Sequence, residues 1–203
     1  MTSKTYRPSQ QTKANILQKA MELFNEKGTA TVSMNSLAQA LGISAGNLQY
    51  HYRSKKEVIR DILEELFKQF DLIYGTSEEP LTPDTLRHIM RLTIDLVWKY
   101  RFFYRESPAL LRNDKTLALR FREIEETRLA QQEAIFKRLA ATGRVPIDLR
   151  PDELHNVVQM GWVLVHTWLP YAESTGQKID EAALEHAVEV MVQFYKPYIG
   201  DLG

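Results

Sequence analysis

The chain has 203 residues, of which 44% are hydrophobic and 26% charged, and this composition excludes intrinsic disorder. It contains no cysteine, which excludes disulfide scaffolds, thiol nucleophiles and cysteine-ligated metal sites. The net charge is zero, but residues 1–60 hold nine Lys or Arg against three Glu, a net charge of +6 that the remainder balances. Such a basic segment indicates a polyanion-binding head or, equally, an unevenly charged surface.

Helical periodicity recurs along the chain, whereas hairpin turns and sustained alternation are missing, so an all-α fold is expected. A first helix is predicted over 10–27, with Gly28 after its end. Ser33 and Ser44 are expected to cap two short helices. The sequence from Ser54 to Glu57 predicts a capping box that opens a fourth helix, which ends at Gly75.

A linker is expected over 76–82, after which Thr82 caps a fifth helix with proline at its first position. Pro108 is expected to interrupt the following short helix, and Gly143 to close a long one. About nine helices result, divided into a head (1–53) and a body (54–203). The later helices are predicted from 83 to about 100, from 102 to 111, after Asn113 to 141, from 151 to about 176, and after Asp180 to about 195, before Pro197.

No export signal is visible at the N-terminus, so the cytoplasm is the expected location. The longest uncharged stretch, 154–172, contains two histidines, an asparagine, a glutamine and a proline. It is expected to be a helix buried in protein, with no role in a membrane.

Residues 34–56 predict a helix-turn-helix, because Gly42 supplies the positive φ of a tight turn between two short helices. The first side chains of the second helix then face the major groove. Small residues let the backbone approach DNA, amides read adenine, and longer side chains reach phosphates. The candidates for close approach are Ala45 and Gly46, the candidates for reading adenine are Asn47 and Gln49, and the candidates for phosphate contacts are Tyr50, His51 and Lys55. Packing on the first helix is the alternative for Tyr50, and an arm with Lys4 and Arg7 is expected to reach the minor groove or to remain free.

One dense pattern of residues carries a family resemblance, and it consists of Ile16-Leu17, Ala20, Leu23-Phe24, Gly28, Ser33, Leu37-Ala38, Leu41-Gly42-Ile43-Ser44, Gly46-Asn47-Leu48, Tyr50-His51-Tyr52, Ser54-Lys55 and Glu57-Val58-Ile59. Through it, residues 12–63 resemble the DNA-binding domain of the TetR/AcrR (tetracycline-repressor) family. The resemblance implies a homodimer whose C-terminal helical domain binds a small molecule. It also places at DNA-contacting positions Ser33, Ser44, Ala45, Gly46, Asn47, Tyr50, His51 and Lys55.

Gln49 departs from the family pattern, because many members have tyrosine there and that tyrosine often contacts a phosphate. A base contact by Gln49 is the alternative. Leu48 and Tyr52 are expected in the core of the head.

Apolar and aromatic residues of the body predict either an ordinary core or a cavity for the effector that the resemblance implies. A few polar groups would orient the effector. The candidate lining residues are His88, Arg91, Ile94, Trp98, Phe102, Phe103, Gln159, Trp162 and His166.

The last two helices have more apolar surface than one helix face needs, which predicts either a dimer face or burial within the chain. The residues concerned are Val157, Val158, Leu164, Val165, Leu169, Leu184, Val188, Met191, Val192 and Phe194. Gly161 would permit close packing there.

No catalytic motif occurs, and the pair Asp152 and His155 stands alone, so no catalytic residue, cofactor or metal is expected. The sequence therefore predicts a ligand-responsive regulator, most simply a repressor. It would bind a palindromic duplex operator as a homodimer and be released by a small apolar or aromatic effector. The alternative is a helical small-molecule-binding protein or enzyme without specific DNA binding.

Overall fold

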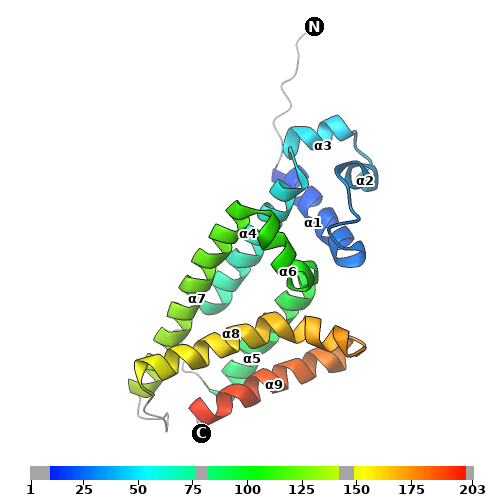
Figure 1. Cartoon of the computed structure of the whole chain (residues 1–203). Helices are drawn as coiled ribbons and strands as arrows, with labels where there is room; N and C mark the ends of the chain where they lie inside the picture. The colour runs from blue at the N-terminus through cyan, green and yellow to red at the C-terminus, as the bar shows by residue number, and fades with distance from the viewer. Residues whose placement is uncertain (1–9, 76–81, 142–148, 200–203) are drawn as a thin grey trace. The chain divides into compact units, whose positions relative to one another are not determined.

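The computed structural model of the chain describes residues 10–75, 82–141 and 149–199, and these residues form nine α-helices and no strand (Figure 1). The prediction of an all-α fold with about nine helices is confirmed. The predicted N-terminal arm, residues 76–81 of the predicted linker and Gly143 lie outside the described residues. The helices are α1 (Gln10–Lys27), α2 (Met34–Ala40), α3 (Ala45–His51), α4 (Lys55–Tyr74), α5 (Pro83–Lys99), α6 (Arg101–Asn113), α7 (Lys115–Ala141), α8 (Pro151–Ser174) and α9 (Glu181–Ile199).

The chain divides into two compact units, Met1–Leu66 and Phe67–Gly203, and the boundary falls within α4. We call the first unit the head and the second the body. No helix among the described residues has both the length and the apolar character to cross a membrane.

In the head, α2 packs against both α1 and α3. The apolar faces predicted from the periodicity meet there, and Ile16, Phe24, Leu37 and Leu48 are almost completely buried. Gly28 has φ +77° and ends α1 by the left-handed conformation that a C-terminal glycine permits.

The start of α4 differs from the predicted capping box. The Oγ of Ser54 accepts a long hydrogen bond of 3.4 Å from the N–H of Glu57. The carboxylate of Glu57, however, accepts from the N–H of Arg53 at 2.8 Å, one residue earlier than the box requires. Only one of the two bonds of the box therefore forms as predicted.

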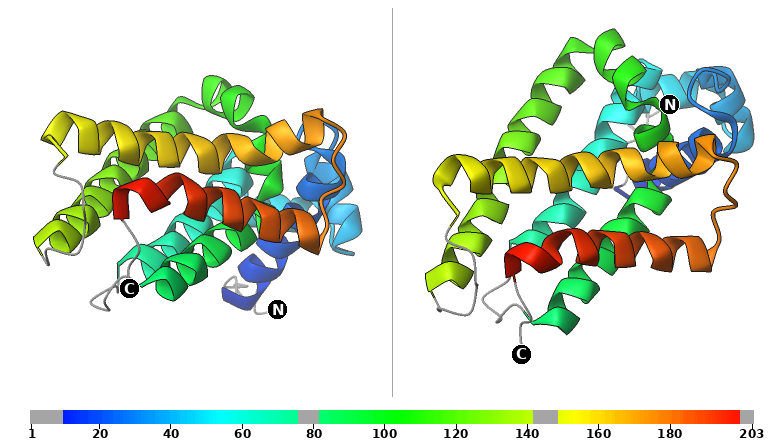
Figure 2. Two further views of the ribbon diagram at one scale, coloured as in Figure 1. Left: turned by 90° about the horizontal axis from the view of Figure 1, so that it is seen from below. Right: turned by 60° about the horizontal axis from the view of Figure 1, so that its bottom comes forward.

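In the body, α5 packs along α9 and also contacts α8, while α6 and α7 cover another side of α8. Both views of Figure 2 show α8 and α9 running side by side in opposite directions. These helices pack into the common core through buried side chains, which include Leu154, Val158, Leu169 and Val188.

Three predicted helix ends in the body were wrong. Asp114, not Asn113, caps α7, since its Oδ1 accepts from the N–H groups of Thr116 and Leu117 at 3.1 and 3.2 Å. Helix α6 continues through Pro108, and α9 continues through Pro197. A proline removes its own backbone donor and crowds the carbonyl four residues earlier, but in α6 the buried residues 102–104 anchor the preceding turn.

Candidate DNA-binding surface and effector cavity

The turn between α2 and α3 has the geometry predicted from its glycine. Gly42 has φ +66°, a conformation that a side chain would strain. The N–H of Ile43 then donates to the carbonyl of Ala38 at 3.1 Å, which closes the end of α2. The chain leaves this turn at Ser44, directly before α3.

The outward face of α3 consists of the residues predicted to contact DNA. Ala45, Gly46, Asn47, Gln49 and Tyr50 are exposed, and nothing lies within 4 Å of a Cβ built on Gly46. Leu48 and Tyr52 are buried, with exposed fractions of 1% and 2%, which confirms the prediction that they belong to the core. The N-terminal end of α3 therefore presents two small residues, followed by the exposed side-chain amides of Asn47 and Gln49.

Two candidate serines act as helix caps. The Oγ of Ser33 accepts from the N–H of Ser36, and the Oγ of Ser44 accepts from the N–H of Asn47, each at 3.1 Å. Both serines are exposed, so capping leaves them at the surface.

Lys55 has a structural role inside the head. Its ammonium donates to the carbonyls of Thr29 and Val32, the latter at 2.9 Å, and thereby joins α4 to the segment before α2. The side chain is half-buried. His51 is half-buried too, and its ring meets the ring of Tyr50 edge-on with centroids 5.6 Å apart.

Tyr52 fixes the C-terminal end of α3 to α4, because its hydroxyl donates to Oδ2 of Asp61 at 3.0 Å. Burial of the ring, together with the Asp61 carboxylate, raises the pKa of Tyr52 above its usual value. The phenol therefore stays protonated as a donor.

The body contains two adjacent apolar cavities of about 40 and 20 Å³. Ligand pockets typically have about 300 Å³ or more, so these cavities are too small to hold a typical ligand without movement of their lining. Both are lined by Tyr74, Met90, Gln132 and Tyr195, which come from α4, α5, α7 and α9.

The polar groups around the cavities are uncharged. The hydroxyls of Tyr74 and Thr93 share a hydrogen bond of 2.9 Å, and the hydroxyl of Tyr195 donates to Oε1 of Gln132 at 3.4 Å. Burial lowers the pKa of His166 to about 4 and raises that of Tyr74. A lining of this kind suits an uncharged apolar molecule with one or two hydrogen-bonding groups.

Two of the nine predicted cavity residues, Trp162 and His166, line the smaller cavity. Their rings lie 4.3 Å apart between centroids. Ile94, Phe102 and Phe103 are buried in the core away from the lining, where Phe103 meets the ring of Phe121.

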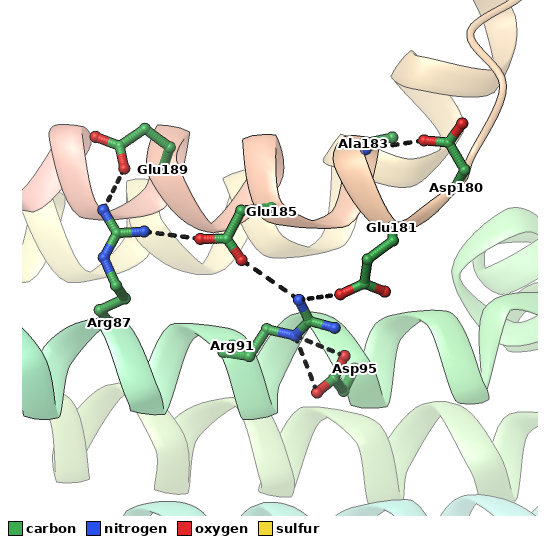
Figure 3. A network of polar contacts seen from close by, with 8 residues as sticks. All are labelled: Arg87, Arg91, Asp95, Asp180, Glu181, Ala183, Glu185 and Glu189. Atoms are coloured by element: carbon green, nitrogen blue, oxygen red, sulfur yellow. Dashed lines mark hydrogen bonds and ion pairs between the residues drawn. The ribbon is translucent and has the colours of Figure 1, made fainter.

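The remaining predicted cavity residues lie outside both linings. His88 and Gln159 are exposed, and Trp98 carries the guanidinium of Arg101 over its ring at 4.5 Å. Arg91 lies in a surface network in which two arginines of α5 reach acids of α9 (Figure 3). The Arg91 guanidinium pairs there with the Glu181 carboxylate at 2.6 Å, because Arg91 lies on the side of α5 that faces α9. Over residues 10–75, 82–141 and 149–199, no three His, Asp or Glu side chains group as a metal site.

Of the four residues that both cavities share, Met90 was expected from the apolar face of its helix, whereas Tyr74, Gln132 and Tyr195 were missed. Gln132 carried a usable signal, because it follows Leu129 by three residues and precedes Phe136 by four, and so lies on the apolar face of α7. Tyr195 gave no such signal. Its place follows from Gly161, where a Cβ would lie 1.8 Å from the Tyr195 hydroxyl.

Most residues predicted for the dimer face are buried within the chain itself. The neighbours of α8 and α9 already cover Val157, Val158, Leu169, Leu184, Val188 and Met191. Leu164, Val165, Val192 and Phe194 are half-buried. The exposed apolar residues of the pair are instead Met160, Val163, Tyr171 and Val190, with exposed fractions of 50%, 42%, 69% and 36%.

Comparison with known proteins bears on both units. Residues 16–62 match the family model described as bacterial regulatory proteins, tetR family, and residues 63–202 match the TetR model described as bacterial transcriptional repressor. The probable HTH-type transcriptional regulator YttP of Bacillus subtilis is 23% identical over 194 residues, which cover 94% of this chain and 90% of that protein.

A solved TetR-family regulator from Marinobacter aquaeolei is similar to the chain, with a TM-score of 0.83 and 28% identity, over 93% of this chain and 91% of that one. The Staphylococcus epidermidis negative transcriptional regulator IcaR is 27% identical over 94 residues, 45% of this chain and 51% of that protein. These relatives are regulators and not enzymes. The head with its exposed recognition helix and the helical body together identify the chain as a member of the TetR family of bacterial transcriptional regulators.

Proposed function

We propose that this regulator is a repressor that binds a roughly palindromic operator as a homodimer and leaves it when a small apolar or aromatic molecule enters the body. A regulator that binds operators in the bacterial chromosome would act in the cytoplasm, which is the location that we propose. The DNA-binding domain is proposed to comprise residues 1–53, and residues 54–203 are proposed to serve ligand binding and dimerisation.

The observation that carries the DNA-binding part is the outward face of α3. Asn47 and Gln49 stand exposed beside Ala45 and Gly46, so amides are available where the backbone can approach a duplex closely. Asparagine and glutamine bond adenine in the major groove through two hydrogen bonds. Two such heads would occupy successive major grooves about one helical turn apart.

Support for the dimer comes from the exposed stripe on α8. Met160, Val163 and Tyr171 recur at helical spacing and are at least 42% exposed. Pairing of α8 and α9 with the same helices of a second copy would bury this stripe in a four-helix arrangement.

Support for the effector comes from the lining of the two cavities. Its rings and aliphatic groups are accompanied by a histidine whose pKa of about 4 keeps it neutral, by hydroxyls and by one amide. An effector there can shift the protein only by its differential affinity for the DNA-bound and released states.

DNA recognition is tested by selecting duplexes from a random library with the purified protein. A two-fold symmetric sequence should be enriched and bound about 10³-fold more tightly than its shuffled counterpart. Asn47→Ala should reduce that ratio by about thirtyfold or more, since one bidentate contact carries about 1–3 kcal/mol of discrimination and a homodimer would make two of them. Asn113→Ala, a change at an exposed asparagine of α6, is the matched control. Equal affinities of the wild-type protein for selected and shuffled duplexes would refute the proposal.

The dimer is tested by sedimentation of Val163→Glu, which places a charge on the stripe. This variant should be monomeric and bind the selected duplex weakly. Leu119→Glu changes a residue of α7 that is 60% exposed and outside the stripe, and it should remain dimeric. A dimeric Val163→Glu protein would exclude this face.

The effector is tested by a thermal-shift screen of small molecules, followed by duplex release. A true effector should raise the melting temperature of the wild-type protein and release the selected duplex. Trp162→Ala should change its affinity, because that ring lines the smaller cavity. An effector that acts with unchanged affinity on Trp162→Ala would lie elsewhere.

A further inference from the structure

The head contains a recess of about 190 Å³ between the start of α2 and the side of α3, far larger than the cavities of the body. It is lined by Met34, Asn35, Ala45, Gln49, Tyr52 and Arg53. Tyr52 is buried and held by Asp61, so the floor of the recess is rigid. The three polar lining residues, Asn35, Gln49 and Arg53, are exposed.

Those three side chains have no partner within the part of the chain that the structure describes. The backbone N–H of Arg53 is occupied by Glu57, but its guanidinium is free, and so are the two amides. Among the residues that the structure describes, none that lines the recess is acidic. The recess therefore gathers one fixed positive charge and two amide donors around an unfilled space.

We propose that this recess seats one phosphate of the operator backbone, with Arg53 as its charged ligand and Asn35 and Gln49 as neutral donors. This inference rests on the proposed DNA-binding function. In a helix-turn-helix the first helix crosses the DNA backbone while the leading residues of the second reach the bases. A recess bounded by both helices therefore lies where a phosphate passes.

The chemistry favours a phosphate over a base edge. Arginine binds phosphate oxygens through two parallel hydrogen bonds, and amide N–H groups satisfy the remaining oxygens. Gln49 is exposed and lines the recess together with Arg53, so its amide can donate to an oxygen of the same phosphate. Arg53 thus supplies the charged contact. Of the two exposed amides of α3, Gln49 is then assigned to the phosphate, and Asn47 remains to read adenine.

The test measures duplex affinity by fluorescence anisotropy from 50 to 300 mM NaCl, on the selected duplex and on its shuffled counterpart. Each neutralised phosphate contributes about 0.9 to the slope of log K against log salt. Arg53→Gln in a dimer should therefore reduce the slope by about two and weaken both duplexes by about tenfold or more. Arg53→Lys should keep most of the slope. Asn35→Ala should weaken binding at an unchanged slope, since it removes no charge.

Arg122→Gln, which removes the same charge from an exposed position on α7, is the matched control and should leave the slope unchanged. Single methylphosphonate substitutions along the selected duplex then locate the contact. One position should weaken the wild-type protein and leave Arg53→Gln unaffected. An unchanged slope for Arg53→Gln would overturn the phosphate site while leaving DNA binding intact, and a loss confined to the selected duplex would assign Arg53 to base reading instead. A wild-type protein that binds neither duplex would overturn the proposed function itself.

Discussion

His166 provides a pH-dependent stability that can be worked out from its surroundings. Its imidazole lies between the rings of Trp162, Tyr104 and Phe121, at centroid distances of 4.3, 5.3 and 5.7 Å. Nδ1 must carry a hydrogen, because its partner at 3.0 Å is the carbonyl of Trp162 and a carbonyl can only accept. Burial among these rings lowers the pKa of His166 from 6.5 to about 4.

The sign follows from proton uptake. The unfolded chain binds a proton at His166 below pH 6.5, whereas the folded chain binds it only near pH 4, so acid favours unfolding across that window. One pKa unit corresponds to 1.36 kcal/mol, which gives about 3 kcal/mol over the whole window and about 2 kcal/mol by pH 5. This contribution is fully present at pH 7.5.

The assay is urea unfolding at pH 7.5 and pH 5.0 for the wild-type protein and His166→Phe. The phenyl ring keeps the aromatic packing and cannot titrate. Between the two pH values the wild-type protein should lose about 2 kcal/mol more unfolding free energy than the variant. His88→Gln, at an exposed histidine of α5, controls for loss of an imidazole and should follow the wild type. Equal losses for wild type and His166→Phe would refute the reasoning.

Two further predictions concern packing and charge. Gly161→Ala should lower the unfolding free energy by about 1–3 kcal/mol, because its Cβ would overlap the Tyr195 hydroxyl. Gly46→Ala, which has open space around its Cβ, is the control and should melt no lower than the wild-type protein. Equal melting temperatures for the two variants would contradict the packing argument. Arg128 is buried, and its Nη2 lies 2.7 Å from the Asp71 carboxylate. Asp71→Asn should therefore destabilise the protein in urea unfolding, and the further change Arg128→Met should restore stability, because it removes the unpaired buried charge. A double variant as unstable as Asp71→Asn would contradict the pairing.

Local chemistry made much of the fold predictable from the sequence. Ser33, Ser44 and Thr82 cap their helices, and Gly42 makes the turn, because each acts through atoms within a few residues. The same locality explains the errors. Asn113 and Asp114 are adjacent and both are good caps, so only the backbone conformation at Asp114 decides between them.

The interior of the body was harder to predict, because its polar residues find partners far along the chain. Arg128 follows Ile124 by four residues and precedes Gln132 by four, so both polar residues lie on the inner stripe of α7. The helical spacing predicts that both side chains face the interior, but it does not predict their hydrogen-bond partners. The guanidinium donates to the carbonyl of Phe67 at 3.0 Å, 61 residues away, and Gln132 accepts from Tyr195, 63 residues away. The cavity lining depends on these distant pairings.

The small size of the cavities limits how an effector can act. A molecule larger than their combined 40 and 20 Å³ must displace lining residues, and Tyr195 lies wedged against Gly161 between α9 and α8. Moving that ring would change the packing of α9 against α8, the helix whose exposed stripe is proposed to pair with a second copy. An effector would therefore act on the proposed dimer face itself, with no long relay through the body. The resulting change in DNA affinity is bounded by the effector's differential affinity for the two arrangements of α8 and α9.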